Sequence, residues 1–137
     1  MIRTATAVWN GDLKTGTGVI STQSTVLNES QYSFRTRFED GVGTNPEELI
    51  AAAHAGCFSM AFSAQLGERG IVPASIETSC AITMESLVLT TSTLTTTVTA
   101  IGADEDLVRE AAAAAEAGCP ISKVLDLDIQ LNLTVIV

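Results

Sequence analysis

Alternating hydrophobic and polar positions predict strands in both halves of the chain. The cleanest alternation covers residues 125–135, where every second residue is Leu, Ile or Val and the residues between them are mostly polar. Residues 75–85 alternate in the same way, and residues 87–101 are rich in Thr and other β-branched residues, which favour one or two more strands. Near the start of the chain, strands are predicted over residues 4–10, 17–26 and 31–39.

A long apolar stretch predicts a helix from about Pro46 to Arg69. Thr44 or Asn45 can cap it, the proline suits the first helical position, and Gly70 can end it. Because the stretch is apolar nearly all round, the helix must be covered on every side. The rest of a 137-residue chain is too short to do this comfortably, so we expect a second subunit to help. The length of this apolar stretch also raises the question of a membrane span, but its high Ala content and its polar residues favour a buried helix of a soluble protein.

A second helix is predicted after the acidic run that begins at Asp104, and Gly118-Cys119-Pro120 interrupts it. The predicted order is strands, helix, strands, helix, strand, which is typical of an α+β fold. The length suits a single domain over residues 1–137.

Composition and charge exclude several classes of partner. Hydrophobic residues make up 46% of the chain and charged residues 17%, as in globular proteins. The net charge of −9 argues against a nucleic-acid partner or an anionic membrane surface, since both repel acidic proteins. No basic segment followed by an apolar run opens the chain, so we expect a cytoplasmic protein.

The three cysteines are an odd number and widely separated, which argues against a static disulfide framework. One His and no C-x-x-C argue against structural zinc. Cys80 shares the apolar row of its strand and is interpreted as a small buried hydrophobic residue. Cys57, in the middle of the long helix, is either a core residue or a nucleophile that requires a cation nearby. Cys119, between Gly and Pro, is either a core residue at a helix end or a mobile thiol.

Two further groups have alternative interpretations. His54 lies one turn before Cys57, which suggests either a Cys–His hydrolase or simply a buried or interface His. Arg35 and Arg37 share a predicted strand face with Glu39, and this pattern alone indicates a solvated, charge-balanced surface.

The chain resembles the OsmC/Ohr family, which comprises osmotically inducible protein C and the organic hydroperoxide resistance proteins. The stretch from Gly43 to Met60, which contains Asn-Pro-Glu-Glu and His-Ala-Gly-Cys, is similar to the signature of that family. Ala117-Gly118-Cys119-Pro120-Ile121-Ser122 resembles its second-cysteine motif. The opening Trp9-Asn10-Gly11-Asp12 and the later Arg37-Phe38-Glu39 are closer to the OsmC branch. The resemblance covers nearly the whole chain, although the region from Met84 to Ile101 is shorter and richer in Thr than expected.

The resemblance implies an OsmC-like fold, with antiparallel sheets, a long buried central helix and a second helix. It implies an intertwined homodimer with its active sites at the subunit interface. It also implies that Cys57 is the peroxidatic cysteine and Cys119 the resolving cysteine, with Arg37 and Glu47 near the reactive sulfur. Ten residues of straight helix span roughly 15 Å, so Glu47 cannot touch Cys57 along one helix. Either the helix breaks or the partner chain supplies the pair, and we expect the partner chain to supply it.

The implied activity is a thiol-dependent peroxidase that reduces organic hydroperoxides, and hydrogen peroxide as a further substrate, to the alcohol or water. Cys57 would become a sulfenic acid and then a Cys57–Cys119 disulfide, which a dithiol of the lipoyl type would reduce. No cofactor and no metal is needed. Two alternatives stay open, the His54–Cys57 hydrolase and a non-catalytic redox sensor or apolar ligand-binding dimer. Candidates for an apolar pocket wall are Phe34, Phe38, Phe58, Met60, Phe62 and Met84.

Overall fold

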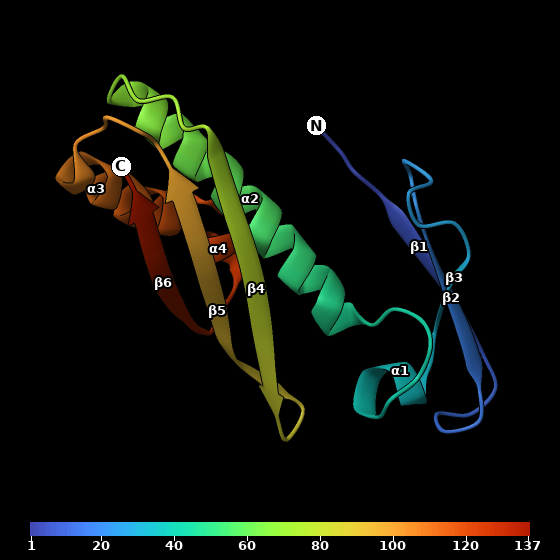
Figure 1. The fold of residues 1–137 in the computed structure, drawn as a ribbon. Coiled ribbons are helices and arrows are strands. Elements are labelled where there is room, and N and C mark those ends of the chain that lie inside the picture. Colours follow the sequence, from blue (N-terminus) through green and yellow to red (C-terminus); the bar gives the residue numbers. More distant parts are fainter. The chain divides into compact units, whose positions relative to one another are not determined.

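The computed structural model describes residues 1–137, which form two compact units, 1–49 and 50–137 (Figure 1). In the first unit, β1 (Ala5–Asn10), β2 (Thr17–Thr22) and β3 (Ser30–Tyr32) form an antiparallel sheet in that order. Gly18 lies opposite both Trp9 and Tyr32, and a Cβ there would come within 2.5 Å of the tyrosine ring. The glycine therefore lets these two aromatic rings pack together across the sheet, with centroids 5.5 Å apart.

The strand predicted over residues 31–39 is wrong beyond Tyr32, because α1 (Phe34–Phe38) replaces it. Ser33 caps this short helix: its hydroxyl accepts a hydrogen bond from the Thr36 backbone N–H, and the Thr36 hydroxyl accepts one from the Ser33 backbone N–H. This reciprocal pair satisfies two backbone donors and overrides the alternating pattern. The strand predicted over 17–26 also ends early, at Thr22, before Thr25 adopts a positive φ of 64° in a turn.

The long helix α2 (Pro46–Glu68) is confirmed and is unbroken. Asn45 caps it, since its side-chain oxygen accepts a 2.7 Å hydrogen bond from the Glu48 backbone N–H. The helix ends just before Gly70, whose φ of +72° favours glycine. The break that would bring Glu47 and Cys57 together within one chain is therefore absent.

The second unit contains a three-stranded sheet, in the order β4 (Ser75–Glu85), β5 (Val88–Thr99), β6 (Asp128–Ile136). The β4–β5 pair is antiparallel as expected, whereas β5 and β6 run parallel. Their connection contains α3 (Glu105–Gly118) and α4 (Pro120–Val124), which meet at Cys119, so the predicted interruption is confirmed. The order of elements is that of an α+β fold. The core lies between α2, α3 and one sheet face, and its buried residues are Phe58, Phe62, Leu66, Leu94, Val98, Val108, Ala111, Ala112 and Ala115.

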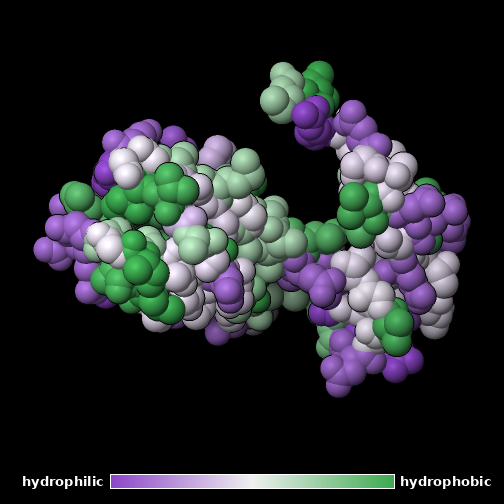
Figure 2. Space-filling model, turned by 45° about the horizontal axis from the view of Figure 1, so that its top comes forward, coloured by the Kyte–Doolittle hydropathy of each residue, from purple (hydrophilic) through white to green (hydrophobic).

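One face of α2 is buried against this core, and the opposite face is uncovered. The uncovered face is made mostly of small residues, with Met60 77% exposed among them. Its members are Ala52, Ala53, Gly56, Met60, Ser63, Ala64 and Gly67. By length and composition α2 is the one helix that could cross a membrane. The core helix of a soluble protein can meet the same criteria of length and composition. Only 22% of its most apolar window is buried within the chain, and Figure 2 shows hydrophobic side chains on the outside of both units.

Candidate active site

Cys57 and Cys119 lie side by side in the second unit. Their sulfur atoms are 2.8 Å apart and share one S–H···S hydrogen bond, and both cysteines are free thiols. Cys57 comes from the middle of α2, and Cys119 ends α3 and begins α4. Because a disulfide bond is about 2.05 Å long, a small displacement is enough to form one.

The surroundings of the two sulfurs affect their acidity in opposite directions. Burial raises the pKa of the Cys57 thiol, and the hydrogen bond with Cys119 raises it further. Burial alone would raise the pKa of Cys119 as well, but its hydrogen bonds with Cys57 and with the backbone and hydroxyl of Ser122 lower that pKa overall. No Lys or Arg is hydrogen-bonded to either sulfur. Within residues 50–137, nothing therefore favours the thiolate at Cys57 over the thiolate at Cys119.

His54 is fully buried one turn before Cys57, and both its ring nitrogens are hydrogen-bonded to serines. Nδ1 lies 2.6 Å from the Ser92 hydroxyl on β5, and Nε2 lies 2.8 Å from the Ser122 hydroxyl on α4. Cys80 on β4 lies 3.2 Å from the same Ser92 oxygen and 4.0 Å from Nδ1. Burial lowers the pKa of His54, which favours the neutral ring. Cys80 is thus part of a polar network, and its interpretation as a plain hydrophobic residue is incomplete.

Arg37 and Glu47 form an ion pair in the first unit. Nε and Nη2 of the guanidinium both donate to Oε1 of the carboxylate, at 2.9 and 2.8 Å. The guanidinium carbon also lies 5.2 Å from the centre of the Phe38 ring. Glu47 is the more enclosed partner, with its side chain 14% exposed against 40% for Arg37, and its Oε2 is buried without a hydrogen-bond partner. The carboxylate and the ring hold the guanidinium in place, while Nη1 keeps its donors free.

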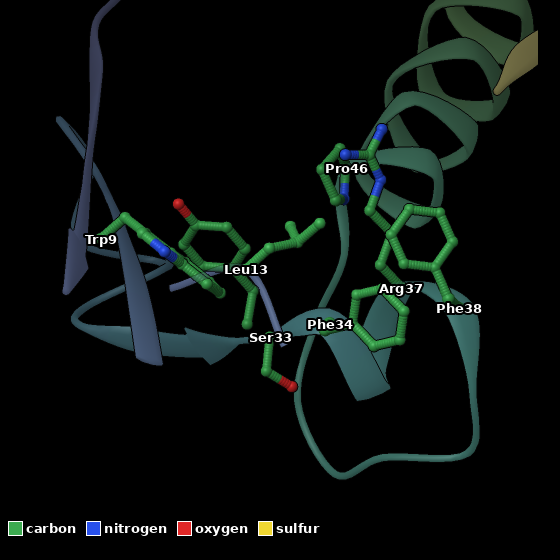
Figure 3. Close-up of a pocket in the computed structure, with 8 residues that line it drawn as sticks. Trp9, Leu13, Ser33, Phe34, Arg37, Phe38 and Pro46 are labelled. Atoms are coloured by element: carbon green, nitrogen blue, oxygen red, sulfur yellow. The ribbon is translucent and has the colours of Figure 1, made fainter. Parts of the chain in front are cut away.

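An open cavity of about 260 Å³ lies beside this ion pair (Figure 3). In Figure 3, the side chains of Phe34, Phe38 and Arg37 lie near Pro46 at the start of α2. The lining is mostly aromatic and aliphatic, with the guanidinium as its charged group. The residues around it are Trp9, Leu13, Tyr32, Ser33, Phe34, Arg37, Phe38 and Pro46.

The candidate wall residues divide between the two units. Phe34 and Phe38 line the cavity. Phe58 and Phe62 are completely buried and belong to the core. Met60 lies on the uncovered face of α2, and Met84 lies on the half-buried row of β4.

The structure brings together Cys57 with Cys119, and Arg37 with Glu47, but the two pairs belong to different units. Sequence reasoning missed the serines on both sides of His54, which come from β5 and α4. No group of three or more His, Cys, Asp or Glu side chains is placed to hold a metal ion.

Comparisons with known proteins agree on one family. Residues 39–134 match the family described as OsmC-like protein. The chain is 46% identical over 130 residues to "Peroxiredoxin OsmC" of Escherichia coli strain K12, with 92% of this chain and 91% of the relative covered, and equally so to that of Shigella flexneri. Among solved structures, it resembles the organic hydroperoxide resistance protein OhrB of Bacillus subtilis, with 26% identity, a TM-score of 0.69 and 96% and 98% coverage. It also resembles an OsmC-like protein of Mycoplasma pneumoniae, with 14% identity, a TM-score of 0.77 and 100% and 99% coverage.

Proposed function

Because the chain belongs to the OsmC-like protein family, we propose that it is a cysteine-based peroxidase that reduces organic hydroperoxides. The observation that carries this proposal is the 2.8 Å contact between the Cys57 and Cys119 sulfurs, which suits a cycle between two thiols and a disulfide. The relative in E. coli is named a peroxiredoxin, and the one in B. subtilis is named for organic hydroperoxide resistance.

In the proposed cycle, the Cys57 thiolate attacks the terminal oxygen of the hydroperoxide. The O–O bond breaks, the alcohol leaves and Cys57 becomes a sulfenic acid. Cys119 then attacks the Cys57 sulfur, water leaves and a disulfide forms. A dithiol reductant, which we take to be of the lipoyl type, reduces the disulfide by thiol–disulfide exchange. The residues use no metal or prosthetic group in any of these steps, and the reaction takes place in the cytoplasm, where such reductants act.

The proposed cycle requires a cation beside the Cys57 sulfur, and no cationic side chain of residues 50–137 is bonded to that sulfur. Arg37 is suited to the role, because Glu47 and Phe38 hold the guanidinium while its Nη1 forms no hydrogen bond. Glu47 and Cys57 are ten residues apart on the unbroken α2, roughly 15 Å along the axis. We therefore assign Arg37 and Glu47 of one subunit to the Cys57 of the other, in a homodimer whose two active sites lie at the interface.

The cavity beside Arg37 favours a substrate with an apolar group. Its aromatic lining can bind the organic part of a hydroperoxide, while the guanidinium binds the peroxide oxygens. Hydrogen peroxide makes no use of the apolar lining, so it is the poorer substrate.

The uncovered face of α2 is the surface that we assign to the dimer. Within the single chain, a Cβ added at Gly56 meets no atom within 4 Å. Gly56→Leu is therefore expected to be harmless or slightly stabilising in an isolated subunit, since glycine disfavours helices by about 1 kcal/mol. If a partner helix packs there, the leucine side chain prevents close approach. We expect size-exclusion chromatography with light scattering to show a dimer for the parent and a monomer for Gly56→Leu.

The control for this change is Ala113→Leu, which adds a similar side chain at an exposed position of α3. It is expected to leave the dimer intact. A dimer of unchanged stability in both Gly56→Leu and Gly67→Leu would place the interface elsewhere.

The hydrolase alternative loses its base in this geometry. A Cys–His hydrolase requires the imidazole to accept the thiol proton directly. His54 instead uses Nδ1 for Ser92 and Nε2 for Ser122, and it forms no hydrogen bond with Cys57. The redox-sensor alternative keeps the same two thiols and differs only in the absence of turnover.

A thiol count after one equivalent of peroxide tests the proposed function. The reduced protein, freed of reductant, is mixed with about one equivalent of cumene hydroperoxide per chain, and free thiols are titrated. We expect two thiols to be lost per chain, because the adjacent Cys57 and Cys119 sulfurs close a disulfide. Peptide mass mapping is expected to show the Cys57–Cys119 link with Cys80 free.

Steady-state consumption with a lipoyl dithiol then separates an enzyme from a sensor. Continued peroxide consumption supports the peroxidase. A single stoichiometric burst in the presence of reductant identifies a sensor, and survival of all three thiols contradicts both.

A further inference from the structure

The turn between β1 and β2 begins with a motif that the proposed cycle does not yet use, Trp9-Asn10-Gly11-Asp12. The next residue, Leu13, is the only member of this turn besides the strand ends that lines the cavity beside Arg37, which we call the Arg37 cavity. In Figure 3, the Leu13 side chain extends toward Arg37 and Pro46. It is 64% exposed, although it is a large hydrophobic side chain. An apolar group bound in the cavity would cover it.

Hydrogen bonds within the turn hold Leu13 in place. One oxygen of the Asp12 carboxylate accepts hydrogen bonds from the backbone N–H and the hydroxyl of Thr15, at 2.7 and 2.8 Å. The Asp12 carbonyl oxygen accepts a third, from the Gly16 backbone N–H, at 3.0 Å. The two bonds with Thr15 hold the pKa of the Asp12 carboxyl below its usual value, so the carboxylate stays ionised and accepting at neutral pH. The turn also requires Gly11, whose φ of +93° favours glycine.

The same turn is fixed to the aromatic wall of the Arg37 cavity. The indole Nε1 of Trp9 donates a 3.1 Å hydrogen bond to the Gly11 carbonyl oxygen. Gly16 lies against the indole ring, since a Cβ there would come within 2.9 Å of it. Trp9 in turn packs against Tyr32, and both rings line the cavity. Leu13 is therefore part of a wall that is held in position, with α1 on the other side of the cavity (Figure 3).

We propose that Leu13 is a specificity-determining residue, whose side chain contacts the organic group of a hydroperoxide while Arg37 binds the peroxide oxygens. The proposal rests on the proposed function and names the part of the substrate that this wall recognises. The volume of the cavity, about 260 Å³, lies below the roughly 300–1,000 Å³ of pockets for drug-sized molecules. The organic group is therefore compact, about the size of one aromatic ring. Hydrogen peroxide has no organic group and gains nothing from Leu13.

Binding of a stable product tests this contact without any chemistry. The probe is cumyl alcohol, which is formed when cumene hydroperoxide is reduced. Trp9 is the only tryptophan in the chain and lines the cavity, so its fluorescence reports binding there. We expect a saturable change in the parent and about tenfold weaker binding in Leu13→Ala, because the apolar contact is lost. Leu13→Met keeps a side chain of similar volume and is expected to bind within about threefold of the parent.

Rates of Cys57 oxidation test the same contact during the reaction. Thiol loss is followed by stopped flow, once with cumene hydroperoxide and once with hydrogen peroxide. In Leu13→Ala, the rate with cumene hydroperoxide is expected to fall about tenfold, while the rate with hydrogen peroxide stays within about twofold of the parent. A merely structural role of Leu13 would change both rates together, so the ratio of the two rates is the quantity to compare.

Variants of Asp12 and Val26 provide the controls. Asp12→Ala removes both hydrogen bonds with Thr15 and lets Leu13 move, so the ratio of rates is expected to fall about threefold. Asp12→Asn keeps an acceptor oxygen and is expected to restore the ratio. Val26→Ala shortens another hydrophobic side chain of the first unit, which is 85% exposed and does not line the cavity. It is expected to match the parent in binding and in both rates.

The outcomes distinguish the role of Leu13 from the function on which it rests. A parent protein without a saturable fluorescence change, or a Leu13→Ala protein with the parent ratio of rates, overturns the role of Leu13 alone. A loss of dimer in Leu13→Ala with an unchanged ratio also overturns it and assigns the side chain to the subunit interface. Leu13-dependent binding of cumyl alcohol by a protein that forms no Cys57–Cys119 disulfide supports the contact and overturns the peroxidase.

Discussion

Replacing Cys57 with serine is expected to abolish peroxide reduction, with a loss of at least about 1,000-fold in steady-state rate. The hydroxyl of serine is not ionised at neutral pH and cannot accept an oxygen atom as sulfur does. Cys119 would remain, with its pKa already lowered, so the expected loss of activity would show that a thiolate near the site is not sufficient by itself. The measurement is consumption of cumene hydroperoxide with excess lipoyl dithiol.

The matched variant is Cys119→Ser, which keeps Cys57 and removes only the resolving thiol. It is expected to be oxidised once, with a sulfenic acid that dimedone traps, and then to stop because no intramolecular disulfide can form. The roles of the two cysteines would be exchanged if Cys57→Ser traps a sulfenic acid at Cys119 and Cys119→Ser traps none. Such a result would agree with the acidities that residues 50–137 alone produce.

Replacing Arg37 with methionine is expected to reduce the rate of Cys57 oxidation about 100-fold, because the thiolate loses its cation. The same change leaves Glu47 without the two hydrogen bonds that its Oε1 accepts. Stopped-flow measurement of thiol loss at equal peroxide concentrations gives the rate.

Mixed dimers decide which subunit supplies the guanidinium. Subunits carrying Arg37→Met and subunits carrying Cys57→Ser are each nearly inactive. If Arg37 acts on the partner's cysteine, a mixed dimer has one complete site, so an equal mixture that exchanges subunits should regain roughly a quarter of the parent activity. If Arg37 acts within its own chain, no mixed dimer has a complete site and the mixture stays inactive.

Much of the fold could be predicted because the patterns over residues 75–85 and 125–135 and the caps at Asn45 and Gly70 are local signals. The short helix after Tyr32 could not be predicted, because the alternation of its residues fits a strand equally well. The reciprocal hydrogen bonds of Ser33 and Thr36, a capping box, stabilise the helix α1 instead. The usual sequence signature of a capping box ends in Glu or Gln rather than Thr. The parallel pairing of β5 with β6 was also beyond reach, since residue patterns do not determine strand direction. The single domain over residues 1–137 stays a prediction, because the subunit divides into two compact units.

The candidate site was predictable only where a motif surrounded each residue. Cys57 and Cys119 are 62 residues apart, and only the family resemblance linked them before the structure placed them in contact. The partners of His54 are 38 and 68 residues away and belong to no motif. One signal was available: Ser92 occupies the same strand face as Leu94 and Val98, and a hydroxyl on a core-facing row needs a buried partner.

The parallel pairing of β5 and β6 affects how a newly made subunit folds and becomes active. The segment that carries Cys119 lies between these two strands in sequence, so its position becomes fixed only when they pair. Such pairing between distant segments is slow, because the entropy of loop closure is lost before contacts compensate for it. Until β5 and β6 pair, the three reduced thiols are exposed on an incompletely folded chain, and an oxidant can form a disulfide between the wrong two cysteines. Correct maturation therefore requires folding to finish before oxidation begins, so a newly made subunit depends on a reducing surrounding before it can remove oxidants itself.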